Sequence, residues 1–181
     1  ATWRRDWRRA IEDGVDVNAQ APDGTTALHW AAYNGNAALV ERLVAAGADV
    51  TAANQFGSTP LAEAAVVGNA EIIEALLEGG APVDAPGADG QTALMVAART
   101  GKPDAVSAQL SRGADPNARV KEFPPMRRYL LPLASLEWVD VTGQTAFIRA
   151  AQAGDVPLMR LLLAKGADPR ITTFNGTTAL M

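Results

Sequence analysis

The chain of 181 residues contains no cysteine and a single histidine, His29. The missing cysteines exclude disulfides, thiolate metal ligands and cysteine nucleophiles, and one histidine leaves few metal or acid–base sites that could use imidazole. No apolar run approaches the ~20 residues that a membrane-spanning helix needs. No phosphate-binding glycine loop, metal-ligand spacing or set of nucleophile and base stands out. We therefore expect a non-catalytic protein with no cofactor, no metal and no insertion into a membrane.

Aromatic residues are also scarce, at 6%, whereas alanine fills 37 positions. Small side chains favour many closely packed helices over one bulky core. The formal net charge is -4, and basic residues are concentrated in residues 1–9 and 119–131, each with a sum of +3. Because nucleic-acid binding requires a continuous positive surface, this distribution argues against a nucleic-acid partner.

The chain does contain a repeated string, Thr-x-(Leu/Phe)-x-x-Ala-Ala. It begins at Thr26, Thr59, Thr92 and Thr145, and a truncated copy begins at Thr178. The intervals are 33, 33, 53 and 33 residues, so the third interval holds one period plus an insertion of 20. After each complete copy comes a second apolar segment of helical period, which a glycine closes.

Each repeat therefore predicts two helices. We expect the first helices at 26–33, 59–66, 92–99 and 145–152, and the second at 37–46, 70–79, 103–112 and 156–165. The hydroxyl of each repeat threonine can cap its first helix, and Gly24 and its equivalents suit a tight hairpin turn. Periodic aspartates indicate turn formers, at positions 16, 49, 84, 115 and 168. One helix pair cannot bury its apolar face alone, so neighbouring pairs must supply the core.

The string, the period of 33 and the sequence Gly-Ala-Asp-Pro-Asn-Ala at 113–118 resemble the ankyrin repeat. The Ala- and Arg-rich style resembles bacterial multi-repeat ankyrin proteins, many of which are exported, and the compartment of this chain stays open. The resemblance implies an all-α solenoid of stacked helix-turn-helix units with projecting hairpin loops. It also implies a non-catalytic module that binds a protein partner.

We expect a single array over residues 1–181. A partial leading unit covers 1–20, further units lie near 21–53, 54–86, 87–118 and 140–172, and a truncated last unit covers 173–181. The insertion 119–142 separates the third unit from the fourth. Since both ends fall inside a unit, we expect the sequence to be part of a longer chain.

Two polar residues depart from the apolar pattern of the helices. His29 occupies a slot where the family usually has a histidine that hydrogen-bonds within the turn network and bridges adjacent units, so we expect a structural role. Gln109 takes the slot of Leu43, Leu76 and Leu162. Because an unpaired buried amide is costly, Gln109 needs a hydrogen-bond partner or partial exposure.

Two tryptophans near the start, Trp3 and Trp7, lie four residues apart on one predicted helical face. The leading half-unit must cover the helix that begins near Thr26, so we expect both to pack there. The alternative is an exposed anchor for a partner or for upstream units.

The insertion allows two interpretations. Its apolar run, which ends at Trp138, could fold back over the stack and fill the gap near Gln109. Alternatively it forms a finger that binds the partner, since arginine, tyrosine and tryptophan dominate interface energetics. The anchors of such a finger are Arg127, Arg128, Tyr129 and Trp138.

In this architecture the hairpin tips and the turn after each first helix form the concave face, where we expect a protein partner to bind. The candidate residues of this face are Asp23, Tyr33, Gln55, Phe56, Val66, Val67, Asp89, Arg99 and Phe174. An exposed strip that is rich in apolar side chains is typical of an interface. The alternative is a peptide or small-ligand sensor in which the insertion acts as a lid. Either function is compatible with a place in a larger assembly.

Overall fold

The computed structural model describes residues 14–120, 142–174 and 176–179. The chain divides into two compact units, unit 1 over residues 1–82 and unit 2 over residues 83–181. Within the described ranges the regular elements are α-helices, and a single isolated β-bridge joins Gln20 to Thr26. The prediction of an all-α fold is therefore confirmed.

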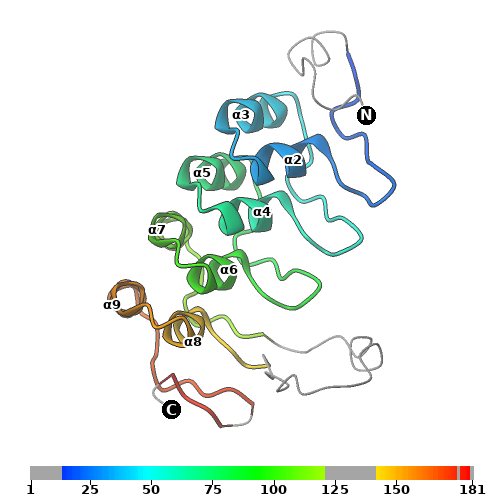
Figure 1. Cartoon of the computed structure of the whole chain (residues 1–181). Coiled ribbons are helices and arrows are strands. Elements are labelled where there is room, and N and C mark those ends of the chain that lie inside the picture. Colours follow the sequence, from blue (N-terminus) through cyan, green and yellow to red (C-terminus); the bar gives the residue numbers. More distant parts are fainter. Residues whose placement is uncertain (1–13, 121–141, 175, 180–181) are drawn as a thin grey trace, which may run out of the picture. The chain divides into compact units, whose positions relative to one another are not determined.

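Unit 1 contains two helix pairs, α2 (Ala27–Tyr33) with α3 (Ala37–Ala45), and α4 (Pro60–Val67) with α5 (Ala70–Glu78). The first helices α2 and α4 pack side by side, as do the second helices α3 and α5, so the unit has two layers (Figure 1). The core between the layers is apolar and buried, with its largest side chains from Leu28, Leu43, Leu61, Ile72, Ile73 and Leu76.

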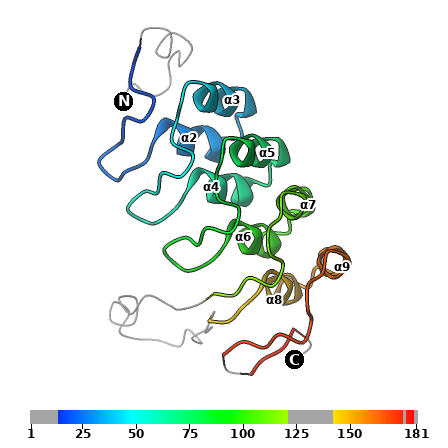
Figure 2. The ribbon, with the colours of Figure 1, turned by 180° about the vertical axis from the view of Figure 1, so that it is seen from behind.

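Unit 2 repeats this arrangement with α6 (Ala93–Arg99), α7 (Pro103–Ser111), α8 (Ala146–Gln152) and α9 (Val156–Ala164). Here α6 packs on α8 and α7 packs on α9 (Figure 2). Its buried core includes Leu94, Met95, Val106, Phe147, Ile148, Leu158 and Leu162. All eight predicted helices agree with the structure to within one residue at each end.

The helix starts follow from capping chemistry. The hydroxyl oxygen of each repeat threonine accepts a hydrogen bond from the backbone N–H three residues later, as predicted. Three of the second helices are capped in the same way by Asn36, Asn69 and Asp155. The remaining second helix, α7, begins after Lys102, which makes no side-chain capping bond, so Pro103 at its first position is its main local start signal.

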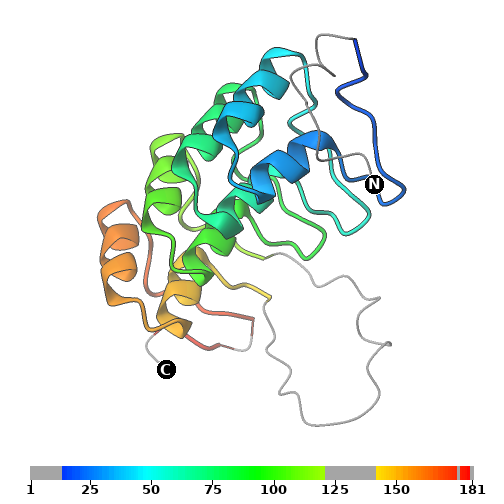
Figure 3. The same ribbon diagram turned by 45° about the horizontal axis from the view of Figure 1, so that its top comes forward.

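Hairpin loops precede the first helices and project from the helix layers (Figure 3). In unit 1 the loop before α2 lies against the loop before α4, where the N–H of Gln55 donates to the carbonyl of Asp23 at 2.8 Å. Gly24 makes this approach possible, because its φ is +79° and a Cβ there would lie 3.2 Å from the Cα of Asn54. The loops are thus tied to one another as well as to their own helices.

Polar side chains link successive repeats at the ends of the second helices. Asn18 accepts a hydrogen bond from the N–H of Asp49 at 2.7 Å and donates to the carbonyl of Gly47 at 3.2 Å. Asn117 makes the same two bonds with the N–H of Asp168 and the carbonyl of Gly166, at 2.7 and 3.0 Å. The side-chain amide therefore supplies one donor and one acceptor to the next repeat.

Four of the five periodic aspartates act as predicted, because Asp16, Asp49, Asp115 and Asp168 each accept the N–H two residues later. Asp84 also lies in a turn, although the residue two positions later, Pro86, has no N–H to donate. Its carboxylate instead accepts the N–H of Asp115, at 3.0 and 3.2 Å, and so takes the role of Asn18 and Asn117. A carboxylate can replace only the acceptor half of that role.

The ends of the insertion keep the hairpin register. The N–H of Val120 donates to the carbonyl of Gln144 at 3.1 Å, and the N–H of Gly143 donates to the carbonyl of Val120 at 2.7 Å. Ala21 makes the same two bonds in the loop before α2. The repeat pattern thus continues through Val120 and resumes at Gly143, so the additional residues enter the chain at the tip of a hairpin.

The buried side-chain amide of Gln109 is only partly hydrogen-bonded. The side chain is fully buried, and its Nε2 donates to the carbonyl of Ala105 at 3.1 Å, while its Oε1 has no hydrogen-bond partner. The sequence predicted either a partner or exposure, and the structure provides a partner for one of the two polar atoms. The third helix pair thus has two local defects, an unpartnered buried amide oxygen at Gln109 and a start of α7 without a side-chain cap.

Replacing Gln109 by leucine is expected to raise the free energy of unfolding by about 1–3 kcal/mol, since it removes an unpaired buried oxygen from a slot that holds leucine elsewhere. Urea unfolding of the full chain followed by circular dichroism measures the change. Gln109→Ala serves as the control and should lower stability, because it leaves a cavity. A less stable leucine variant would show that the amide makes a stabilising contact.

Candidate functional site

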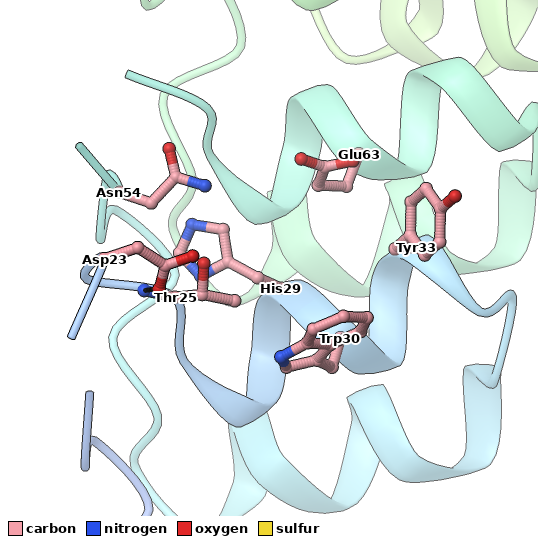
Figure 4. Close-up of a pocket in the computed structure, with 7 residues that line it drawn as sticks. All are labelled: Asp23, Thr25, His29, Trp30, Tyr33, Asn54 and Glu63. Atoms are coloured by element: carbon pink, nitrogen blue, oxygen red, sulfur yellow. Dashed lines mark hydrogen bonds between the residues drawn. The ribbon is translucent and has the colours of Figure 1, made fainter. Parts of the chain in front are cut away.

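A pocket of about 350 Å³ opens on the first-helix layer of unit 1 (Figure 4). Two loops and two helices contribute to it: the loop before α2, α2 itself, the loop before α4, and α4. The lining residues are Asp23, Thr25, His29, Trp30, Tyr33, Asn54 and Glu63. Since α2 packs against α4, the repeat period of 33 places Glu63 on α4 next to the equivalent Trp30 on α2.

His29 holds the two repeats together at this site. Its Nδ1 accepts a hydrogen bond from the N–H of Thr26 at 3.2 Å, so its ring proton resides on Nε2, which donates to the carbonyl of Ser58 at 2.9 Å. The side chain is 2% exposed. Both ring nitrogens are occupied, and the predicted structural role of His29 is therefore confirmed.

Two carboxylates occupy fixed positions in the pocket. Asp23 accepts the N–H of Thr25 at 2.9 Å, and hydrogen bonds from the backbone and side chain of Thr25 lower the pKa of Asp23. Glu63 accepts the hydroxyl of Ser58 at 2.6 Å and lies in the first turn of α4, where the helix dipole favours a negative charge. The pocket thus contains two acidic groups whose hydrogen bonds hold them in place.

Trp30 and Tyr33 form an edge-to-face aromatic pair on α2. Their ring centroids are 6.2 Å apart, and their planes meet at 87°. The two side chains are 50% and 55% exposed, so this pair offers large apolar surface to a ligand. Tyr33 was predicted as a binding residue, whereas Trp30 was missed.

The signal that could have found Trp30 is the variability of its repeat position. Four residues after each capping threonine the chain has, in order, Trp30, Glu63, Val96 and Arg149. Neighbouring positions on the same helices keep small or apolar types, as in the Ala-Ala pair. A position whose residue type differs in every repeat is not constrained by one packing contact that all repeats share. Such a position can hold a residue that recognises a partner.

The other residues predicted for unit 1 lie outside the pocket lining. Phe56, at a hairpin tip, is 69% exposed, and Val66, on α4 at the position equivalent to Tyr33, is also exposed. Gln55 is exposed, and Val67 is half-buried. The structure therefore brings Asp23 and Tyr33 together in the pocket and exposes Phe56 and Val66 on the same unit.

In unit 2 the predicted residues Arg99 and Phe174 are exposed, and Asp89 is half-buried. Asp89 accepts the N–H of Gln91 at 3.0 Å and also a bond from the side-chain amide of Gln91. A further residue, Arg149 on α8, is 7% exposed, and its Nε and Nη2 have no hydrogen-bond partner. Burial lowers the pKa of Arg149, and so does the positive charge of Arg99, whereas Asp89 opposes them.

Several predicted residues lie outside the part of the chain that the structure describes. They are the insertion anchors Arg127, Arg128, Tyr129 and Trp138, together with Trp3 and Trp7. Their roles remain predictions.

Among the described residues, no group of three or more histidine, cysteine, aspartate or glutamate side chains is arranged to hold a metal ion. In the same part of the chain, every helix is too short or too polar to span a membrane.

Comparison with known proteins identifies the family. The family model for ankyrin repeats in three copies matches residues 8–86 and 28–120, and the model for a single ankyrin repeat matches residues 142–174. No curated protein matches the chain. The family matches together span more than half of the sequence and cover the helix pairs described above. Ankyrin repeats generally mediate protein–protein interactions and are typically non-catalytic. The chain therefore belongs to the ankyrin-repeat family and has its all-α repeat solenoid fold.

Proposed function

We propose that the chain is a non-catalytic scaffold that binds a protein partner through the first helices and hairpin loops. In unit 1 we define the recognition surface as Asp23, Trp30, Tyr33, Phe56, Glu63 and Val66. The observation that carries the proposal is the exposure of four large apolar side chains on this one surface, each between 42% and 69% exposed. Large apolar side chains exposed on the same unit as a pocket support an interface.

The local structure supports binding with little loss of entropy. The hydrogen bond between the Gln55 N–H and the Asp23 carbonyl joins the two loops, and His29 fixes both loops through Thr26 and Ser58. A surface whose loops are already ordered loses little conformational freedom when a partner binds.

The proposal includes further contributions from unit 2 and the insertion. Asp89, Arg99 and Phe174 occupy the equivalent loops and helix of unit 2. The insertion would add its anchors Arg127, Arg128, Tyr129 and Trp138, and a place in a larger assembly fits this scheme. The alternative of a peptide or small-ligand sensor with the insertion as a lid gains no support from the pocket described above, which lies at the first two complete repeats.

Selection of a random peptide library against the immobilised full chain tests the recognition surface. We expect enriched peptides whose affinity falls by at least about tenfold for the double variant Tyr33→Ala and Phe56→Ala, because exposed aromatic anchors dominate interfaces. Isothermal titration calorimetry with resynthesised peptides measures the change. The control Val156→Ala removes an apolar side chain of similar exposure on α9 and should leave the affinity unchanged.

Peptides that bind the double variant as tightly as the original chain would argue against the recognition surface. If the same peptides lose affinity only when residues 122–138 are deleted, the insertion rather than this surface binds the partner.

A further inference from the structure

We propose that the pocket of unit 1 recognises a basic side chain, lysine or arginine, that the protein partner presents. This inference rests on the proposed function in one respect, namely that the basic side chain belongs to a protein. The preference for a basic side chain is argued from the pocket alone. Three properties favour it: the charge of the lining, its aromatic pair and the size of the pocket.

The charge of the lining is negative. Asp23 and Glu63 contribute two carboxylates, and the lining residues include neither lysine nor arginine. The ring nitrogens of His29 are already engaged, because Nδ1 accepts from the N–H of Thr26 and Nε2 donates to the carbonyl of Ser58. A cation entering the pocket therefore meets two carboxylates and no lysine or arginine among the lining residues.

The aromatic pair adds a second attraction for the same class of ligand. Trp30 and Tyr33 are half-exposed and stand nearly perpendicular, so both an indole face and a phenol ring border the pocket (Figure 4). A cation over an aromatic face is attracted by the negative charge of the ring face, most strongly over tryptophan. The aliphatic stem of lysine or arginine can pack on the same rings while its charged end reaches a carboxylate.

The size of the pocket suits one side chain. Its volume of about 350 Å³ lies at the small end of the range for ligand sites. An acidic side chain would face two like charges, and an apolar side chain would desolvate both carboxylates without bringing an opposite charge to either. A basic side chain satisfies the acidic groups and covers the aromatic ones.

The NMR signal of the Trp30 indole N–H in the ¹⁵N-labelled full chain reports occupancy of the pocket. This signal is assigned by its disappearance from the spectrum of Trp30→Leu. The probes are Nα-acetyl-lysine amide and Nα-acetyl-arginine amide, with the neutral analogues Nα-acetyl-norleucine amide and Nα-acetyl-citrulline amide. We expect saturable changes in the chemical shift of this signal with the two basic probes at millimolar concentration, and much smaller changes with the neutral analogues.

Two variants remove one charge each while they keep the local hydrogen bonds. Glu63→Gln can still accept from Ser58, and Asp23→Asn can still accept from Thr25. Each should weaken binding of the basic probes by about two- to fivefold, as expected for a partly exposed ion pair. Glu41→Gln, on the exposed face of α3, changes the net charge equally and should leave binding unchanged.

Equal shifts with the neutral analogues, or unchanged binding in both charge variants, would overturn the basic-ligand proposal. The peptides selected above separate this failure from a failure of the proposed function. If binding of these peptides requires Tyr33 and Phe56 but tolerates replacement of every lysine and arginine in the peptide, the surface binds a protein and the pocket does not recognise a basic side chain. If the basic probes bind the pocket but no selected peptide depends on the surface, the pocket chemistry holds and the protein-binding function fails.

Discussion

Replacing Leu162 by alanine is expected to lower the free energy of unfolding by about 2–5 kcal/mol. Leu162 lies on α9, which packs against α7, and its side chain is fully buried. A helix pair of this fold is stable because its apolar face is covered, so a cavity in the buried core at α9 weakens the packing of unit 2. Urea unfolding of the full chain, followed by circular dichroism, measures the loss.

The chain provides a matched control in the next residue. Leu163 is 42% exposed on the same helix, so Leu163→Ala removes the same atoms with nearly the same helix propensity. Its effect should be about 1 kcal/mol and clearly smaller than that of Leu162→Ala, because much of its surface stays in water in the folded chain. Equal losses for both variants would show that helix propensity, rather than burial of Leu162, accounts for the loss of stability.

The helices could be predicted from the sequence because their signals are local. A threonine hydroxyl such as that of Thr145 caps the N–H groups of its own helix, and Pro103 starts α7 without reference to any distant residue. The period of 33 then repeats these signals, so one well-understood unit predicts the others. His29 was also predictable, since the residues that bind it lie in the turn network that the repeat defines.

The pocket could not be predicted in full because it depends on contacts between repeats. Trp30 lies between the buried His29 and Ala31 in the sequence, and its exposure follows only from the direction in which α2 presents that position to α4. Glu63 reaches the pocket from the next repeat by the same geometry. Both were missed because the expected binding face comprised only the hairpin tips and the turns after the first helices.

Asp84 illustrates the same limit at a smaller scale. As a periodic aspartate it was expected to form a turn, and it does lie in one, but the residue equivalent to Asp49 in this repeat is Pro82. Asp84 instead falls in register with Asn18 and Asn117 and bonds to the next repeat. Register within the repeat, rather than residue type, decided its role.

Replacing Arg149 by methionine is expected to raise the free energy of unfolding by about 1–4 kcal/mol. Arginine keeps its charge at any ordinary pH, so the folded chain buries a guanidinium whose Nε and Nη2 have no hydrogen-bond partner, with the like charge of Arg99 close enough to act on it. Methionine retains most of the aliphatic length and removes the desolvated charge. Urea unfolding of the full chain measures the gain.

Arg149→Lys separates charge from packing in this prediction. Lysine keeps the positive charge and a long aliphatic stem, so this variant should gain little or no stability if the buried charge is the cause. Arg99→Met, at an exposed position, should change stability by no more than about 0.5 kcal/mol. A methionine variant less stable than the original would show instead that the guanidinium is compensated within the chain. The expected gain would mean that the fourth repeat keeps, at the position equivalent to Trp30 and Glu63, a residue that folding alone does not favour.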